Sequence, residues 1–118
     1  MKDAGKSDEL DGILAAWRNA SIETLSATLH QDFVAFGRED GLFVKADRHT
    51  FLTYAKISSM HLLAQAGIRS CDVHGALATA CLTHDIPGAR RNTVLTMLKS
   101  GQGWQVMTAI FVVVDVVA

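Results

Sequence analysis

The sequence is short of several residue types that mark particular classes of protein. It contains one proline, one tyrosine and two cysteines in 118 residues. Two isolated cysteines do not make the disulfide framework of a small secreted domain. The 11 basic and 12 acidic residues leave a net charge of −1, and no basic stripe marks a nucleic-acid-binding face. We therefore expect no nucleic-acid partner.

Long apolar runs are also missing. No segment approaches the ~20 apolar residues that span a bilayer. The amino-terminal segment MKDAGKSDELDG is charged and lacks the apolar region of a secretory signal. We therefore expect no membrane partner and a cytoplasmic location. Hydrophobic residues make up 49% of the chain, enough for the core of one domain over residues 1–118, in which residues 1–7 are expected to be flexible.

The first half of the chain has a helical pattern. From Ser7, apolar residues recur at helical spacing and predict a first helix. Ser21 can cap a second helix, and Asp47 a third that continues to about Ile57. The apolar positions of the three helices are Leu10, Ile13, Leu14 and Trp17, then Ile22, Leu25 and Leu29, then Phe51, Leu52 and Ala55.

The remaining segments predict six strands separated by turn residues. Their ranges are 33–38, 42–45, about 61–74, 76–86, 89–100 and 103–115. A two-residue turn at 75–76 sets Cys71 opposite Ala80 and points Cys81 to the other face, so two reduced thiols are expected. The fold class is therefore α+β, with three amino-terminal helices on one face of a strongly curved, mainly antiparallel six-stranded sheet.

The last strand lacks a polar face. Its apolar residues are Phe111, Val112, Val113, Val114, Val116 and Val117. Three short helices cover one face of the sheet only, so we expect a second copy of the chain to cover the other face in a two-fold dimer. The alternative is that this tail packs inside one protomer.

The element order and several phrases resemble the nuclear transport factor 2-like superfamily, a cystatin-like cone fold shared by ketosteroid isomerases, polyketide cyclases and scytalone dehydratase. The phrases are LHQDFVAFG at 29–37, GLFVKADRHTFL at 41–52, HGALATACL at 74–82 and LTMLKSGQGWQV at 95–106. LTMLK and GWQV are most similar to the lumazine-binding-like group. The resemblance implies a small-molecule pocket between helices and sheet, and dimerisation through the sheet. It does not imply one function, because this fold hosts enzymes, binding modules and transport adaptors.

The catalytic residues of ketosteroid isomerases do not carry over to this chain. The resemblance places the family's carboxylate base at or near Arg38, a permanent cation that cannot accept a proton. It places the oxyanion-binding tyrosine on the first helix, where this chain has Trp17. Isomerase activity of that type is therefore disfavoured.

Dehydratase chemistry would need a His–Asp pair, and the chain offers two. His30 and Asp32 lie at a helix-to-strand corner, where a turn role is expected. His84 and Asp85 are adjacent in a strand and would face opposite ways. The histidines and cysteines show no metal-ligand spacing, so we expect no metal and no cofactor.

The favoured function is binding of a small apolar or aromatic molecule in the cone by a homodimer, with no evident catalysis. A lyase or isomerase of the polyketide cyclase or dehydratase type, and a protein-interaction module, are the alternatives. Polar side chains on apolar walls would orient the ligand; the candidates are Trp17, Arg38, Tyr54, His84 and Arg91. Arg90 and Arg91 suit a ligand carboxylate or phosphate. The sequence leaves open which strand face each residue occupies, because a one-residue slip in pairing reverses the faces.

Overall fold

The computed structural model describes residues 8–19, 22–39, 41–57, 67–86, 88–101 and 103–115. Its elements, in chain order, are α1 (Asp8–Asn19), α2 (Ile22–Thr28), β1 (Leu29–Glu39), β2 (Leu42–Asp47), α3 (Arg48–Ile57), β3 (Gly67–His74), β4 (Leu77–Ile86), β5 (Ala89–Ser100) and β6 (Gly103–Asp115). This order confirms the α+β prediction. None of the described helices is long and apolar enough to cross a membrane.

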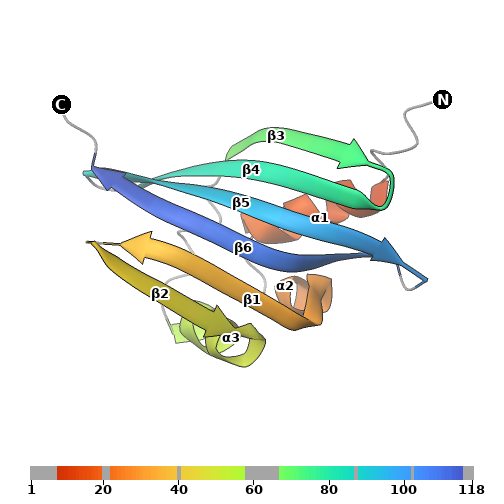
Figure 1. The fold of residues 1–118 in the computed structure, drawn as a ribbon, viewed down its shortest axis with the longest axis horizontal. Helices are drawn as coiled ribbons and strands as arrows, with labels where there is room; N and C mark the ends of the chain where they lie inside the picture. Colours follow the sequence, from red (N-terminus) through yellow and green to blue (C-terminus); the bar gives the residue numbers. More distant parts are fainter. Residues whose placement is uncertain are drawn as a thin grey trace.

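The strands form one open, curved sheet in the order β2-β1-β6-β5-β4-β3. Neighbouring strands run antiparallel except β1 and β6, which run parallel. Figure 1 shows the three helices on one side of this sheet, behind the strands in that view. Helix α3 packs against β1 and β2, whereas α1 and α2 contact β6. We call the helix-covered side the inner face and the opposite side the outer face.

The core lies between the helices and the inner face. The whole apolar stripe predicted for α1 is buried: Leu10, Ile13, Leu14 and Trp17. Trp17, Phe33 of β1 and Phe51 of α3 form a ring cluster, with centroids 5.1 to 6.5 Å apart. Tilted aromatic pairs at such separations add stabilisation beyond the burial of their area. This aromatic cluster joins the first helix, the first strand and the third helix.

Helix α3 begins where the sequence predicts. Asp47 Oδ1 accepts a hydrogen bond from the Thr50 N–H at 2.8 Å, the arrangement of an N-cap. Hydrogen bonds from the Thr50 backbone and side chain lower the pKa of Asp47. The next residue, Arg48, donates from Nη2 to both the carbonyl and the hydroxyl of Ser26, each at 2.9 Å. The cap and this contact fix the start of α3 and tie it to α2.

A few predicted helix and strand positions differ from the structure or lie outside its described part. Leu29 is predicted on the second helix, but α2 ends at Thr28, whose hydroxyl donates to the Leu25 carbonyl at 2.7 Å. Phe51 and Leu52 pack against the core as predicted. The side chain of Ala55 lies outside the described part of the chain, as do residues 61–66 of the predicted third strand.

Strand β1 starts earlier than predicted and is irregular. Its pairing with β6 shifts register between Leu29 and Val34. Within this interval His30 Nδ1 accepts a hydrogen bond from the Asp32 N–H at 2.9 Å. Local bonds of this kind satisfy backbone groups that leave the ladder. The sequence predicts a turn here; the structure instead has a local hydrogen bond between His30 and Asp32 within the irregular first part of β1.

The two cysteines are placed as predicted. Gly75, at φ 63°, forms the tight turn between β3 and β4, and Cys71 pairs with Ala80 across the hairpin. Side chains alternate along β4, so Cys81 points to the opposite face from Ala80. The two cysteines form no disulfide with each other.

A contact between distant segments fixes the start of β6. The Glu9 carboxylate of α1 accepts a hydrogen bond from the Trp104 N–H. Gly103, at φ 97°, lies so close to this carboxylate that a Cβ atom there would collide with it. Trp104 itself is buried in the core. Two constraints favour glycine at position 103: its φ angle is positive, and the Glu9 carboxylate leaves no room for a Cβ atom.

Candidate functional site

The inner face is apolar over most of its length and becomes polar at one end. In the middle and near the β3–β4 turn its buried side chains are Ala78, Ala80, Leu95, Met97 and Val106. Towards the β4–β5 turn, His84 on β4 and Arg91 on β5 take the inner positions. They are direct cross-strand partners, so their side chains lie beside each other.

Both side chains have a buried nitrogen that no described group satisfies. His84 is 4% exposed. Its Nδ1 and the Nε of Arg91 have no hydrogen-bond partner in the described part of the chain. Buried polar atoms in native proteins are nearly always paired with protein or an ordered molecule. Among the described residues, Trp17 Nε1 and Arg48 Nε are likewise buried without a partner. The nitrogens of His84 and Arg91 differ in belonging to directly paired strand positions, and this pair is therefore the candidate binding site.

An aromatic ring supports Arg91. Its guanidinium lies over the Phe111 ring of β6, 5.1 Å from the ring centroid, a cation–π contact. Phe111 pairs with Gly37 across the parallel β1–β6 ladder, and its ring occupies the space that a Cβ at position 37 would need. The absence of a side chain at Gly37 thus lets Phe111 lie flat and hold the guanidinium.

The environment keeps His84 uncharged at neutral pH. Burial lowers the pKa of His84, and the positive charge of Arg91 lowers it further, whereas Asp85 raises it. A neutral imidazole has one nitrogen that donates a hydrogen bond and one that accepts. The site therefore combines a fixed cation with a neutral group able to do either.

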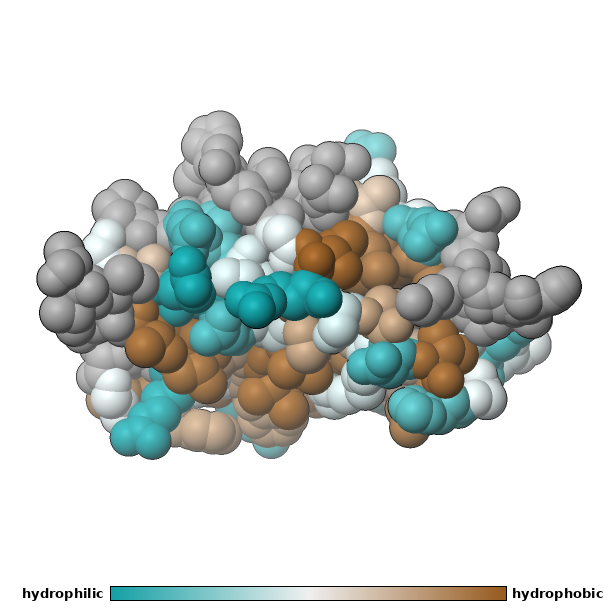
Figure 2. All heavy atoms as spheres, turned by 90° about the horizontal axis from the view of Figure 1, so that it is seen from above, coloured by the Kyte–Doolittle hydropathy of each residue, from teal (hydrophilic) through white to brown (hydrophobic). Residues whose placement is uncertain are grey.

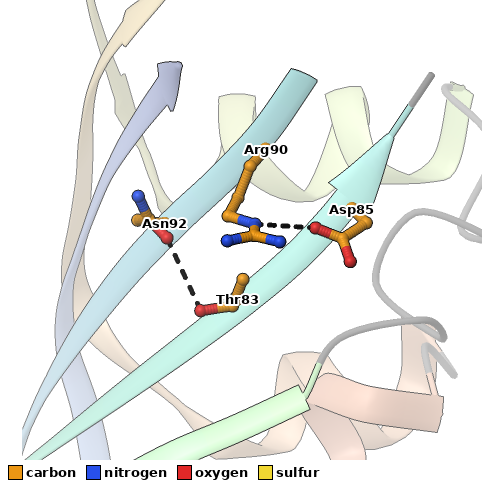
Figure 3. Close-up of polar contacts among 4 residues, drawn as sticks. All are labelled: Thr83, Asp85, Arg90 and Asn92. Atoms are coloured by element: carbon orange, nitrogen blue, oxygen red, sulfur yellow. Dashed lines mark hydrogen bonds and ion pairs between the residues drawn. The ribbon is translucent and has the colours of Figure 1, made fainter. Parts of the chain in front are cut away.

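The acidic neighbour of His84 is on the other side of the sheet. Asp85 lies on the outer face, where its Oδ1 accepts a hydrogen bond from Arg90 Nε at 2.8 Å. Figure 3 shows this pair and, beside it, the Thr83 hydroxyl donating to Asn92 Oδ1 at 3.5 Å. The sequence prediction that His84 and Asp85 face opposite ways is confirmed. The same alternation separates Arg91, at the candidate site, from Arg90, which is paired with a carboxylate.

The lowered pKa of His84 has a consequence for stability. The pKa of His84 is higher in the unfolded state than in the folded state. As the pH falls through 6.5, the unfolded state therefore binds a proton before the folded state does. The free energy of unfolding then decreases until the pH is below the pKa that His84 has in the folded state. This contribution is at most about 1.4 kcal/mol per pH unit. In urea titrations between pH 7.5 and 5, His84→Leu is expected to lose less stability than the unmodified protein.

The matched control for this titration is His74→Leu, which changes an exposed histidine on the outer face of β3. It should keep the full pH dependence. If the free energy of unfolding changes equally with pH in all three proteins, His84 has the same pKa in the folded and unfolded states, and the prediction is wrong.

The other predicted site residues do not gather around His84 and Arg91. Trp17 is buried in the aromatic cluster. Tyr54, on α3, is 59% exposed. Arg38 pairs with Phe43 and Val112, which places it on the outer face. The sequence did not indicate Phe111 or Gly37, because their contact joins strands far apart in the chain and leaves no local signal.

Exposed hydrophobic side chains gather on the outer face. Ile110 of β6 stands between its partners Phe36 of β1 and Val94 of β5. Val112 and Val114 continue the row along β6 and are exposed. We call these five residues the outer patch; the polar residues of Figure 3 lie on the same face near the β4–β5 turn. Figure 2 shows the molecule from above, on the β3 side. In this view hydrophilic side chains divide the hydrophobic surface into separate groups.

Among the residues that the structure describes, no three histidine, cysteine, aspartate or glutamate side chains cluster in a way that would hold a metal ion. The candidate site thus rests on imidazole, guanidinium and apolar groups.

The family model described as "Putative lumazine-binding" matches residues 9–112. No curated protein matches the sequence.

Solved structures of similar fold come from several bacteria. An NTF2-like protein of unknown function from Shewanella baltica has a TM-score of 0.73 at 18% identity, over 92% of this chain and 90% of that chain. One from Silicibacter pomeroyi gives 0.69 at 16% identity over 93% of both chains, and one from Methylobacillus flagellatus 0.67 at 19%, over 92% of this chain and 96% of that chain. At these identities the likeness shows the fold, and function must be argued from the site.

Proposed function

The chain belongs to the lumazine-binding-like family of the NTF2-like superfamily, and we propose that it binds a small molecule on the inner face, beside His84 and Arg91, as a homodimer. The observation that carries the proposal is the pair of buried, unpartnered nitrogens on an otherwise apolar surface. Small-molecule sites typically combine apolar walls with a few polar groups that fix the ligand's orientation. The family description agrees with this type of function.

A ligand screen tests the proposal. The panel contains ring-sized neutral, basic and acidic compounds, including pteridines, steroids and aromatic carboxylates. A ligand at 100 times its Kd should stabilise the folded state by about 2.7 kcal/mol, which a thermal-shift assay detects and calorimetry then quantifies. We expect one ligand per protomer, and affinity roughly tenfold or more weaker in His84→Leu, since a buried polar partner is lost.

The control for the screen is again His74→Leu, which should bind as the unmodified protein does. If no compound of the panel binds, or if every binding compound binds equally well to His84→Leu, the inner-face site is wrong.

The homodimer is proposed from the outer patch. It presents aliphatic and aromatic side chains from three adjacent strands, and such a face is self-complementary about a two-fold axis. The net charge of −1 gives little repulsion between two copies. The polar groups near the β4–β5 turn would then lie towards the rim, which in interfaces is more polar than the centre.

A lyase or isomerase activity is the second candidate, and the same pair of residues favours it. A neutral imidazole can accept a proton from a substrate, and an adjacent guanidinium can stabilise the oxyanion that forms. Recovery of the bound compound separates the two functions: a binding protein returns it unchanged, whereas an enzyme returns a product whose formation requires His84.

A further inference from the structure

We propose that Phe111 and Gly37 are positioning residues of the candidate site: the Phe111 ring, seated on Gly37, holds the Arg91 guanidinium in place. Arg91 belongs to the site of the proposed function, on which this inference rests. Phe111 on β6 and Gly37 on β1 act on that site through Arg91.

Gly37 has no backbone reason to be a glycine. It lies within strand β1 and is buried, and a glycine inside a strand weakens the strand. Gly41 and Gly75, both in turns, have positive φ angles of 79° and 63°, whereas Gly37 does not. Three atoms of the Phe111 ring, Cζ, Cε1 and Cε2, would collide with a Cβ atom at position 37. Glycine is therefore required here because it makes room for the ring.

Strand register brings Arg91 to the same ring. Phe111 pairs with Gly37 on β1 and with Thr93 on β5. Arg91 lies two residues from Thr93 along β5, so it is on the same face as Phe111 and diagonal to it, a separation that long side chains bridge. The Arg91 Cζ atom lies 5.1 Å from the ring centroid. The ring thus connects the glycine of β1 with the arginine of β5.

Arg91 is the member of the candidate site that needs this support. Its cross-strand partner His84 is 4% exposed, so packing restricts the imidazole. Arg91 is only half-buried, and its side chain has more rotatable bonds. A side chain that is ordered before a ligand arrives spares the entropy cost of ordering it on binding. The cation–π contact with Phe111 supplies this order.

Nuclear magnetic resonance without any ligand tests the inference. In the unmodified protein we expect nuclear Overhauser effects between the side-chain protons of Arg91 and Phe111. The Arg91 protons should also be shifted upfield, because an aromatic ring shields protons above its face. Phe111→Leu removes the ring, and Gly37→Ala takes the space that the ring needs. Both variants should move the Arg91 resonances towards those of an exposed arginine.

The pKa of His84, from titration of its ring resonances, connects the ring to the site. Burial lowers this pKa, and the charge of Arg91 lowers it further, so Arg91→Gln should raise it. Phe111→Leu should also raise the pKa of His84, because the guanidinium is no longer held beside the imidazole. In the Arg91→Gln background, Phe111→Leu should cause no further rise. A general loosening of the fold would raise the pKa in both backgrounds.

The variant Gly37→Ala has its own check on folding. The clash with the ring should lower its urea midpoint. Phe111→Leu should relieve that loss in the double variant, because leucine lacks the three ring atoms that collide. The Arg91 resonances should nevertheless remain those of an unsupported side chain, which separates the packing of the ring from its effect on Arg91.

Two controls make the same substitutions elsewhere in the sheet. Phe43→Leu removes a ring from β2 that pairs with Arg38 on the outer face. Gly67→Ala adds a Cβ atom that meets only the Thr83 carbonyl oxygen, at an ordinary contact distance of 3.8 Å. Both variants should leave the Arg91 resonances and the pKa of His84 unchanged.

The outcomes separate this inference from the proposed function. Absence of Overhauser effects between Arg91 and Phe111 in the unmodified protein would overturn the inference. Unchanged Arg91 resonances in Phe111→Leu, or an equal rise of the His84 pKa in both backgrounds, would also overturn it. None of these measurements uses a ligand, so a failed ligand screen rejects the proposed function and leaves the positioning of Arg91 standing.

Discussion

Phe33→Ala is expected to lower the free energy of unfolding by about 3–5 kcal/mol, the usual cost of removing a fully buried aromatic ring. Phe33 is 1% exposed and contacts both Trp17 and Phe51, at centroid distances of 6.5 and 5.1 Å. Its removal therefore opens a cavity where α1, β1 and α3 meet. Against a typical domain stability of about 5–15 kcal/mol, this is a large fraction.

Urea denaturation of three variants measures this effect. Phe33→Leu refills much of the space and should cost less than the alanine variant. Phe43→Ala removes a mostly exposed ring from edge strand β2 and should cost least. The urea concentration at the midpoint of unfolding should therefore be highest for Phe43→Ala, lower for Phe33→Leu and lowest for Phe33→Ala. The slope of the free energy of unfolding against urea concentration should be unchanged. A Phe33→Ala midpoint equal to that of Phe43→Ala would contradict the aromatic cluster as the centre of the core.

Ile110→Glu is expected to weaken the proposed homodimer by at least about 100-fold. Ile110 is 46% exposed and stands at the centre of the outer patch, between Phe36 and Val94. A two-fold axis introduces the new carboxylate from both protomers, so each interface would bury two like charges, at a cost of several kcal/mol. Sedimentation velocity should show twice the 12.7 kDa chain mass for the unmodified protein and a single chain mass for the variant.

The control for the dimer is Val44→Glu. Val44 is 42% exposed, close to Ile110 in exposure, but it pairs with Gly37 and so lies on the inner side of the sheet. This variant should remain a dimer. A single chain mass for the unmodified protein at every concentration, or a dimer that survives Ile110→Glu, would show that the outer patch is not a homodimer interface.

Much of the candidate site could be predicted from residue types and local alternation. The sequence indicates His84 and Arg91 as polar groups on the long strands, and β-strand periodicity separates His84 from Asp85. Alternation does not say which of two neighbours faces the helices, and the sequence therefore does not distinguish Arg38, which lies on the outer face, from His84 and Arg91. The face is decided by pairing register, and a shift of one residue reverses it.

The support of Arg91 was beyond sequence reasoning altogether. Phe111 and Gly37 meet because β6 runs parallel to β1 and antiparallel to β5, so strands from the two ends of the chain become neighbours. Nothing near Phe111 in the sequence marks it as the platform for a guanidinium, and nothing near Gly37 marks the space that the ring fills.

The sequence by itself determined what depends on neighbours in the chain: the apolar stripe of α1, the Asp47 cap of α3, the glycine turns, the placement of the two cysteines and the α+β class. These features follow from backbone periodicity and short-range hydrogen bonds, which a few adjacent residues specify. Only the tertiary structure decided which strand faces look inward, that β1 inserts beside β6, and that His84 and Arg91 share an apolar surface with Phe111. Those properties depend on contacts between segments that are distant in the chain, and hence on packing the whole sheet against its three helices.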